Sequence, residues 1–219
     1  MFESVNVIGA GRAGSAVAAR LEERGVSLRA DGPDLVLLCV PDRAIADVAS
    51  EIAVGPWVAH VSGATPLRAL DPHTRRFSVH PLQTLVRRRG PEQLDGAYGA
   101  VTAETDEARE RGFWIARTLG LEPFELADDD RALYHCAAAF ACGYLVTLHG
   151  VAAALFELVG APPAGLTPLM RRTVDNDFEL TGPAARGDWI TVEGHLQALR
   201  DRRPELVPLY EALAEATVV

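Results

Sequence analysis

A glycine-rich turn between a short apolar run and a helix-forming segment constrains the fold of this chain most. Val5–Ile8 reads as a strand, and Ser15–Arg24 has helical composition. Between them, Gly9, Gly11 and Gly14 form the motif G-x-G-x-x-G. In this context the pyrophosphate of a dinucleotide rests on the helix N-terminus. The first glycine permits the tight turn, the second lets the phosphate approach the backbone, and the third lets helix and strand pack closely.

The segment after this helix is too short for the full second strand of a Rossmann unit. The next buried-strand run, Leu35–Val40, begins after only Val26–Asp34. A strand over Val26–Ala30 would end at the opposite sheet edge, and Gly32–Asp34 spans at most ~10 Å, too little to return. We therefore predict strand–helix–strand, with the adenosine-side strands deleted and the adenosine subsite truncated. Asp31 lies about 20 residues beyond the glycines, where a ribose-binding acid is expected, but this geometry argues against that role.

The composition excludes several classes of function. The chain has 219 residues, of which 21 are basic and 30 acidic, and the net charge of −9 disfavours nucleic acids and anionic membranes as partners. Every basic residue is arginine, so chemistry that depends on lysine is excluded. Cys39, Cys136 and Cys142 lie in apolar runs, and we expect them to be reduced and buried, with neither a disulfide nor a metal site.

The chain gives no signal for export or for a membrane span. It enters a strand directly at the N-terminus, without the basic region and apolar core of a signal peptide. The longest apolar stretch, Cys136–Leu148, is shorter than a bilayer span and is flanked by His135 and His149. We therefore expect a cytoplasmic protein without a membrane partner.

The periodicity of the sequence divides the chain into two domains. Residues 1–126 alternate strands and helices, which predicts an α/β domain built on a truncated Rossmann-like parallel sheet. From Asp128 to Leu158 apolar residues recur at intervals of three or four, which predicts one helix of roughly 30 residues. Gly160–Pro163 ends this helix, and residues 127–219 are expected to form an all-helical second domain.

Six segments, in order along the chain, resemble a bacterial family that joins a Rossmann-like domain to a helical domain of unknown function. They are GAGRAG (9–14), DLVLLCVPD (34–42), HVSGAT (60–65), SVHPLQT (78–84), LYHCAAAFACGYL (133–145) and LTGPAARGDWITVEGHL (180–196). The family lies near 6-phosphogluconate dehydrogenase, pyrroline-5-carboxylate reductase and ketopantoate reductase. The resemblance implies a helical C-terminal domain like that of 6-phosphogluconate dehydrogenase and a homodimer in which the long helix packs between subunits. It also implies an active site between the domains and NAD(P)-dependent reduction of a small carbonyl or imine compound, with ketopantoate as one candidate.

Three departures from the pattern of these relatives leave a second interpretation open. The adenosine-side strands are missing, and the lysine that relatives often use on the long helix is absent. Gly143 stands where the family pattern has an asparagine, which would donate a hydrogen bond to a substrate oxygen. In the second interpretation the chain is a non-catalytic scaffold that has lost dinucleotide binding. It would then act as a small-ligand-binding or dimeric interaction protein.

The candidate site residues follow from the motifs and from this resemblance. His135, one turn into the long helix, is the candidate proton donor for hydride transfer to a carbonyl, although it also fits a capping or packing role. Ser62 and His80 follow strands at the sheet edge where open α/β sheets bind ligands, and both fit ordinary turns equally well. The expected cofactor-binding residues are those of the glycine turn and the end of the next strand: Gly9, Gly11, Arg12, Ala13, Gly14, Val40 and Pro41.

A loop in the helical domain supplies the candidate substrate residues. Arg186 and Asp188 lie in TGPAARGD, which is bounded by glycine and proline. The arginine could hold a substrate carboxylate through two hydrogen bonds. Alternatively, the two side chains pair with each other and fix the loop, within one chain or across a dimer interface.

Overall fold

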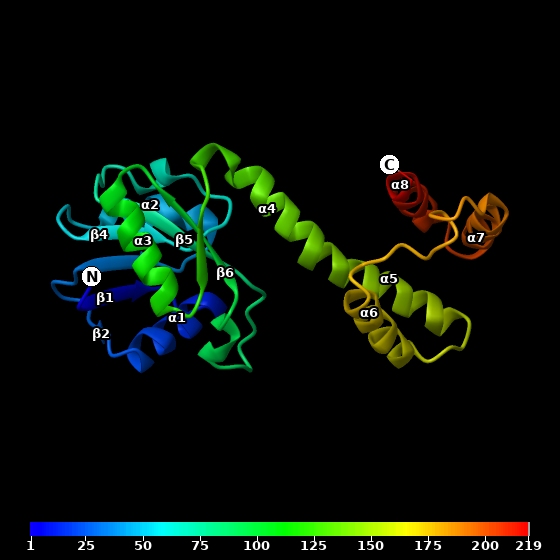
Figure 1. The fold of residues 1–219 in the computed structure, drawn as a ribbon, viewed down its shortest axis with the longest axis horizontal. Coiled ribbons are helices and arrows are strands. Elements are labelled where there is room, and N and C mark those ends of the chain that lie inside the picture. The colour runs from blue at the N-terminus through cyan, green and yellow to red at the C-terminus, as the bar shows by residue number, and fades with distance from the viewer. Residues whose placement is uncertain (219) are drawn as a thin grey trace. The chain divides into compact units, whose positions relative to one another are not determined.

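A computed structural model describes residues 1–218, which form two compact units (Figure 1). The first unit is Met1–Thr147 and the second begins at Leu148. The sequence changes from alternating strands and helices to helices alone at residue 127, whereas the boundary between the compact units falls within the long helix.

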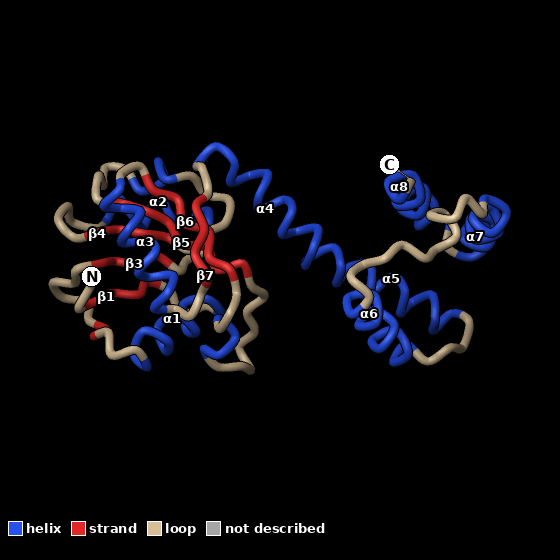
Figure 2. Tube along the Cα trace, viewed as in Figure 1, coloured by secondary structure: helices blue, strands red, loops and turns tan. Residues whose placement is uncertain are grey.

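The first unit contains a seven-stranded sheet in the order β2-β1-β3-β4-β5-β6-β7 (Figure 2). The strands β1 to β5 are parallel, β6 runs antiparallel to β5, and β7 is parallel to β6. This mostly parallel sheet, followed by helices, confirms the predicted fold class. The strands are β1 (Ser4–Ile8), β2 (Ser27–Leu28), β3 (Leu35–Leu38), β4 (Trp57–His60), β5 (Arg76–Leu82), β6 (Tyr98–Ala103) and β7 (Glu122–Glu125).

Helices cover both faces of the sheet, which explains the continuous apolar run of β3. Leu35 and Leu37 belong to the core that includes residues of α1 (Arg12–Glu23) and α3 (Asp106–Thr118). Val36 and Leu38 belong to a second core with residues of α2 (Ile45–Glu51). Since successive side chains of a strand point to opposite faces, a strand covered on both sides is apolar at every position.

The predicted deletion of the second strand was wrong, because a short strand lies between α1 and β3. β2 pairs in parallel with β1 at Ser4 and Val5. It stops at the level of Val5, three residues before β1 ends at Ile8. A strand this short does not cross the sheet, so the few residues after β2 suffice to bring the chain back to the edge where β3 begins. Asp34 completes the return by accepting hydrogen bonds from the backbone N–H groups of Glu3 (2.8 Å) and Ser4 (2.9 Å).

The long helix is present as predicted and runs over Asp128–Leu158, 31 residues. It consists of α4 (Arg131–Ala139), a π-helical segment (Phe140–Tyr144) and α5 (Leu145–Leu158), preceded by one short 3₁₀ turn. The remaining elements of the second unit confirm the helical C-terminal region. They are α6 (Leu166–Asp175), α7 (Trp189–Arg202) and α8 (Val207–Thr217).

The long helix is apolar and exposed in the single chain. Its most apolar 18-residue window has a mean hydropathy of 1.7 and no buried residue. By length and composition alone this helix could cross a membrane. The apolar run Cys136–Leu148 was too short to indicate this, because the helix extends well beyond that run on both sides. Cys136 is exposed and Cys142 half-buried, so the expectation of three buried cysteines holds only for Cys39.

Candidate functional site

The glycine turn lies at the carboxyl end of β1, and the fold itself requires two of its three glycines. Gly9 has φ of +118°, and a Cβ atom there would lie 2.4 Å from the carbonyl oxygen of Cys39. A Cβ atom on Gly14 would lie 1.8 Å from the carbonyl oxygen of Gly9. A Cβ atom on Gly11, by contrast, would meet nothing within 4 Å. Gly11 therefore leaves open space over the backbone, as the approach of a phosphate requires.

The other predicted cofactor residues lie at the same edge of the sheet. Arg12 and Ala13 form the first turn of α1, whose backbone N–H groups attract anions. Val40 and Pro41 follow β3, which pairs with β1 as far as Ile8 and Leu38. Arg12 is exposed and takes part in none of the ion pairs formed by residues 1–218. The turn, the helix N-terminus and this arginine could together hold a pyrophosphate.

A second group of polar side chains gathers beyond the end of β4 and around His80, which lies within β5 and not after a strand as predicted. The Nδ1 atom of His80 lies 2.8 Å from the Tyr134 hydroxyl oxygen, and the rings of His80 and His135 are 5.9 Å apart. A Cβ atom on Gly63 would lie 2.6 Å from His135 Cδ2 and 2.9 Å from His80 Nε2. The structure thus brings together His80, His135 and the Ser62–Gly63 loop, which were predicted from the sequence as separate candidates.

Burial determines the protonation state of His80 and Tyr134. It lowers the pKa of His80 to about 4, and the nearby His135 and Arg131 side chains lower it further. Burial also raises the pKa of Tyr134 to about 12. His80 and Tyr134 are therefore both neutral at neutral pH and interact through a hydrogen bond. His135 is exposed and can exchange protons with solvent.

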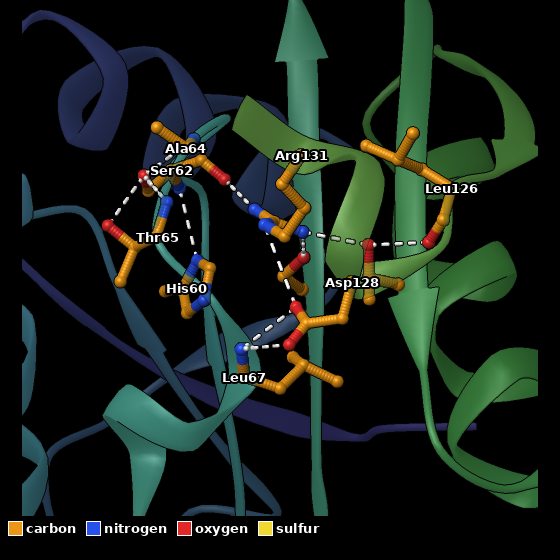
Figure 3. A network of polar contacts seen from close by, with 10 residues as sticks. His60, Ser62, Ala64, Thr65, Leu67, Leu126, Asp128 and Arg131 are labelled. Carbon is orange, nitrogen blue, oxygen red and sulfur yellow. Dashed lines mark hydrogen bonds and ion pairs between the residues drawn. The ribbon is translucent and has the colours of Figure 1, made fainter. Parts of the chain in front are cut away.

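A buried arginine at the start of α4, Arg131, contacts the loop that follows β4 (Figure 3). The Arg131 side chain is 1% exposed, and its Nη1 atom donates to Ser78 Oγ (2.5 Å) and Thr102 Oγ1 (2.8 Å). Its Nη2 atom donates to the carbonyl oxygen of Ser62. The nearest carboxylate oxygen paired with it, on Asp128, is 3.9 Å from Nε, and burial lowers the pKa of Arg131. The guanidinium is thus held mainly by neutral oxygen atoms.

The Ser62 side chain forms the turn that follows β4. Its Oγ atom accepts hydrogen bonds from the backbone N–H groups of Ala64 (3.2 Å) and Thr65 (3.0 Å) and lies 2.9 Å from Thr65 Oγ1 (Figure 3). The backbone N–H of Ser62 in turn donates to Nδ1 of His60 (3.2 Å). The Ser62 hydroxyl is therefore committed to the loop, which accounts for this residue without a catalytic role.

His60, Arg131 and Tyr134 were not among the residues predicted from the sequence. His60 is fully buried, and burial lowers its pKa to about 3. Its Nε2 atom has no hydrogen-bond partner within residues 1–218. His60 lies two residues before Ser62 in HVSGAT, and Tyr134 directly precedes His135 in LYHCAAAFACGYL. Closeness to a predicted residue was the only signal for either. Arg131 follows three aspartates, a pattern typical of an exposed helix start.

The structure fixes Arg186 and Asp188 within their own loop in the second unit. Asp188 caps α7, accepting from the backbone N–H of Thr191 (3.1 Å) and from its hydroxyl (2.7 Å), and these bonds lower its pKa. Arg186 donates to the carbonyl oxygen of Thr181. No ion pair joins Arg186 to Asp188 within residues 1–218, and a pair across a dimer interface stays a prediction. A role in substrate binding stays a prediction.

Solved structures with a similar fold include several oxidoreductases. BF3122 from Bacteroides fragilis, assigned as an NADP oxidoreductase, has a TM-score of 0.82 and 23% identity, over 99% of this chain and 98% of that chain. Pyrroline-5-carboxylate reductase from Streptococcus pyogenes has a TM-score of 0.62 and 15% identity, over 98% and 96%. The reductive aminase from Aspergillus terreus, solved with NADPH and ethyl-5-oxohexanoate, has a TM-score of 0.64 and 16% identity, over 100% and 94%.

These TM-scores, over nearly the whole of each chain, show that the protein shares the fold of NAD(P)-dependent oxidoreductases, a Rossmann-like sheet followed by a helical C-terminal region. No protein of curated function matches the chain in sequence. Residues 97–217, from the start of the antiparallel strand β6 into the last helix, match the family described as a domain of unknown function, DUF2520. The resemblance inferred from the sequence motifs is therefore confirmed, and the chain belongs to the DUF2520 family.

Proposed function

We propose that the protein is an NAD(P)-dependent oxidoreductase that reduces a small carbonyl or imine compound. The observation that carries this proposal is the open space over Gly11, at the N-terminus of a 12-residue helix. Sterics within the chain explain Gly9 and Gly14 but give no reason for a glycine at position 11. A pyrophosphate resting on the turn gives that reason. The fold shared with an aminase solved with NADPH supports the same assignment.

The residues present fit the phosphates of such a cofactor better than its adenosine. Gly9, Gly11, Arg12, Ala13 and Gly14 would hold the pyrophosphate, with Val40 and Pro41 beside them. The strand that normally ends beside the adenosine ribose corresponds to β2, and β2 is short because it ends at the level of Val5. When bound, the nicotinamide supplies a hydride to the substrate.

The residues to which we assign the remaining roles lie beyond the end of β4, within β5 and on the long helix. His135 is the proposed proton donor, because it is exposed and can be reprotonated from solvent. His80 is neutral, and its hydrogen bond to Tyr134 fixes the plane of its ring next to Gly63. Ser62 shapes the loop that carries Gly63.

We propose further that the long helix packs against a second copy of the chain. Leu133, Phe140 and Val146 are 75%, 66% and 70% exposed, and a helix that is apolar on all sides is stable only when covered. A dimer would cover this surface in water. Light scattering should therefore give the mass of a dimer, and a monomer that sediments with lipid vesicles would instead favour a membrane partner.

The proposal is tested by following the loss of NADPH absorbance with a panel of small carbonyl and imine compounds. We expect turnover with at least one compound, and a reduction of roughly a hundredfold or more for His135→Ala. His149→Ala is the matched control, because His149 lies on the same helix outside the site, and it should keep full activity. Unchanged turnover in His135→Ala would remove this residue from the reaction. Failure to bind NADPH at about 1 mM would overturn the proposal in favour of a non-catalytic scaffold.

A further inference from the structure

Gly63 is a buried residue, and its backbone N–H takes part in none of the hydrogen bonds formed within residues 1–218. The N–H groups around it are all satisfied, since Ser62 donates to His60 and both Ala64 and Thr65 donate to Ser62 Oγ. Gly63 lies beyond the end of β4, so no strand ladder accounts for it. Buried backbone donors are nearly always paired, and an unpaired one costs free energy that an acceptor would recover. The Gly63 amide is therefore a donor without its acceptor.

The buried guanidinium of Arg131 acts on this same amide through the carbonyl oxygen of Ser62. The carbonyl oxygen of Ser62 and the N–H of Gly63 belong to one planar peptide unit. Arg131 donates to that carbonyl oxygen, and a hydrogen bond on one side of a peptide strengthens the donor on the other. Asp128, the carboxylate paired with Arg131, is 3.9 Å from Nε and already accepts from the backbone N–H of Leu67 (3.0 Å). The positive charge is thus poorly neutralised next to the Gly63 amide.

The rings of His80 and His135 lie against Gly63 and are further potential hydrogen-bond donors. Nε2 of His80 faces Gly63, at 2.9 Å from the position where a Cβ atom would lie. When Tyr134 donates its hydroxyl proton to Nδ1 of His80, the neutral ring carries its own proton on Nε2 and can donate it. The other ring against Gly63 belongs to His135, which is exposed and can change its rotamer without disturbing the core.

We propose that the Ser62–Gly63 peptide, polarised by Arg131, is the oxyanion-binding donor of this site and that its ligand is the carboxylate of a small organic acid. A charged acceptor gains most from an amide that a cation polarises. In this account Arg131 is a positioning residue, which acts on the ligand through the peptide. The inference deepens the proposed function, because it assigns the substrate to the carboxylic acids that also carry a carbonyl or imine group.

The sequence offers a direct probe of this amide. Ser62–Gly63 is the only Ser–Gly pair in the chain. Labelling serine with carbon-13 at its carbonyl and glycine with nitrogen-15 therefore gives one amide signal in a spectrum filtered for that pair. Pyruvate serves as the carboxylate probe, and pyruvamide as its uncharged counterpart.

We expect pyruvate to move this signal downfield in a saturable way and pyruvamide to leave it in place. Arg131→Gln should weaken the pyruvate response about tenfold or more, because the charge on the peptide is lost. Thr102→Val removes another hydrogen bond of Arg131 but keeps the charge, and its response should stay within about threefold of the wild type. An unmoved signal at about 10 mM pyruvate, or an equal response to pyruvamide, would overturn the inference, even if the Arg131 variant does not fold.

The titration is carried out with and without NADPH, which separates this inference from the proposed reductase. A signal that moves in a protein that does not bind NADPH supports the oxyanion site and contradicts the reductase. A signal that stays in place in a protein that binds NADPH overturns the oxyanion site and leaves the cofactor assignment intact.

Discussion

Arg131 donates a hydrogen bond to the carbonyl oxygen of Ser62, so the first turn of α4 is tied to the loop that ends β4. The same guanidinium reaches β5 through Ser78 and β6 through Thr102. His135 lies four residues after Arg131 and therefore on the same face of the helix. Anchoring Arg131 thus also fixes the position of the His135 backbone relative to the loop of Gly63. One buried side chain positions the loop and the proposed proton donor together.

Replacing Arg131 by methionine should destabilise the first unit by about 2–4 kcal/mol, because several buried oxygen atoms lose their donor. Thr102→Val removes one of these contacts and should cost less, about 1–2 kcal/mol. Urea unfolding followed by the fluorescence of the buried Trp57 reports on this unit. Equal midpoints for Arg131→Met and the wild type would show that the network does not stabilise the fold.

Gly63→Ala should displace the two histidine rings, because the new Cβ atom would lie 2.6 Å from His135 and 2.9 Å from His80. We expect a loss of about 1–3 kcal/mol in the free energy of unfolding and a weaker response to pyruvate. The control is Gly194→Ala in α7, where a Cβ atom meets nothing within 4 Å. That variant should gain about 0.5–1 kcal/mol from helix propensity. A fully active and stable Gly63→Ala would contradict the described geometry.

The buried histidines should make the protein less stable in mild acid. The pKa is lowered to about 3 for His60 and to about 4 for His80, whereas an unfolded histidine titrates near about 6.5. The unfolded chain therefore binds these protons first. Stability is complete above the unfolded pKa and falls with decreasing pH toward the folded values, by up to about 1.4 kcal/mol per pH unit for each histidine.

Urea midpoints measured at about pH 7 and pH 5 test this dependence before most carboxylates titrate. His60→Gln should reduce the difference between the two midpoints, because its side chain does not titrate. An unchanged difference would assign the acid sensitivity to other groups.

The short β2 strand predicts a weak contribution from the adenosine half of a cofactor. Reduced nicotinamide mononucleotide, which lacks that half, should bind within about tenfold of NADH. Competition against NADH fluorescence measures both dissociation constants on one protein sample. A thousandfold difference would mean that other residues of the chain rebuild an adenosine site.

The sequence allowed prediction of the elements whose signal is local. The spacing of Gly9, Gly11 and Gly14 after an apolar run located the turn, and periodicity located the long helix. Ser62 and His80 were predicted at one sheet edge because parallel strands end on the same side, and the structure brings His80 against Gly63 although His80 lies within β5. His135 joined them through its place near the start of the long helix.

The features that were missed depend on contacts that the local pattern does not contain. The length argument against β2 assumed a strand that crosses the whole sheet, whereas β2 pairs only with Ser4 and Val5. Arg131 is buried because Ser62, Ser78 and Thr102, distant in sequence, all offer oxygen atoms to it. Cys136 lies in an apolar run that the single chain leaves uncovered, so apolar character did not imply burial.

Calorimetric titration of the wild type and of Gly11→Ala with NADPH tests the central claim most directly. Gly11 has φ of −73° and open space around it, so alanine should fold equally well and keep the melting temperature. The added methyl group would stand where the pyrophosphate approaches the backbone, and we expect affinity to fall about tenfold or more. Equal affinity in both proteins, or no binding to the wild type at about 1 mM, would contradict a dinucleotide site on the glycine turn.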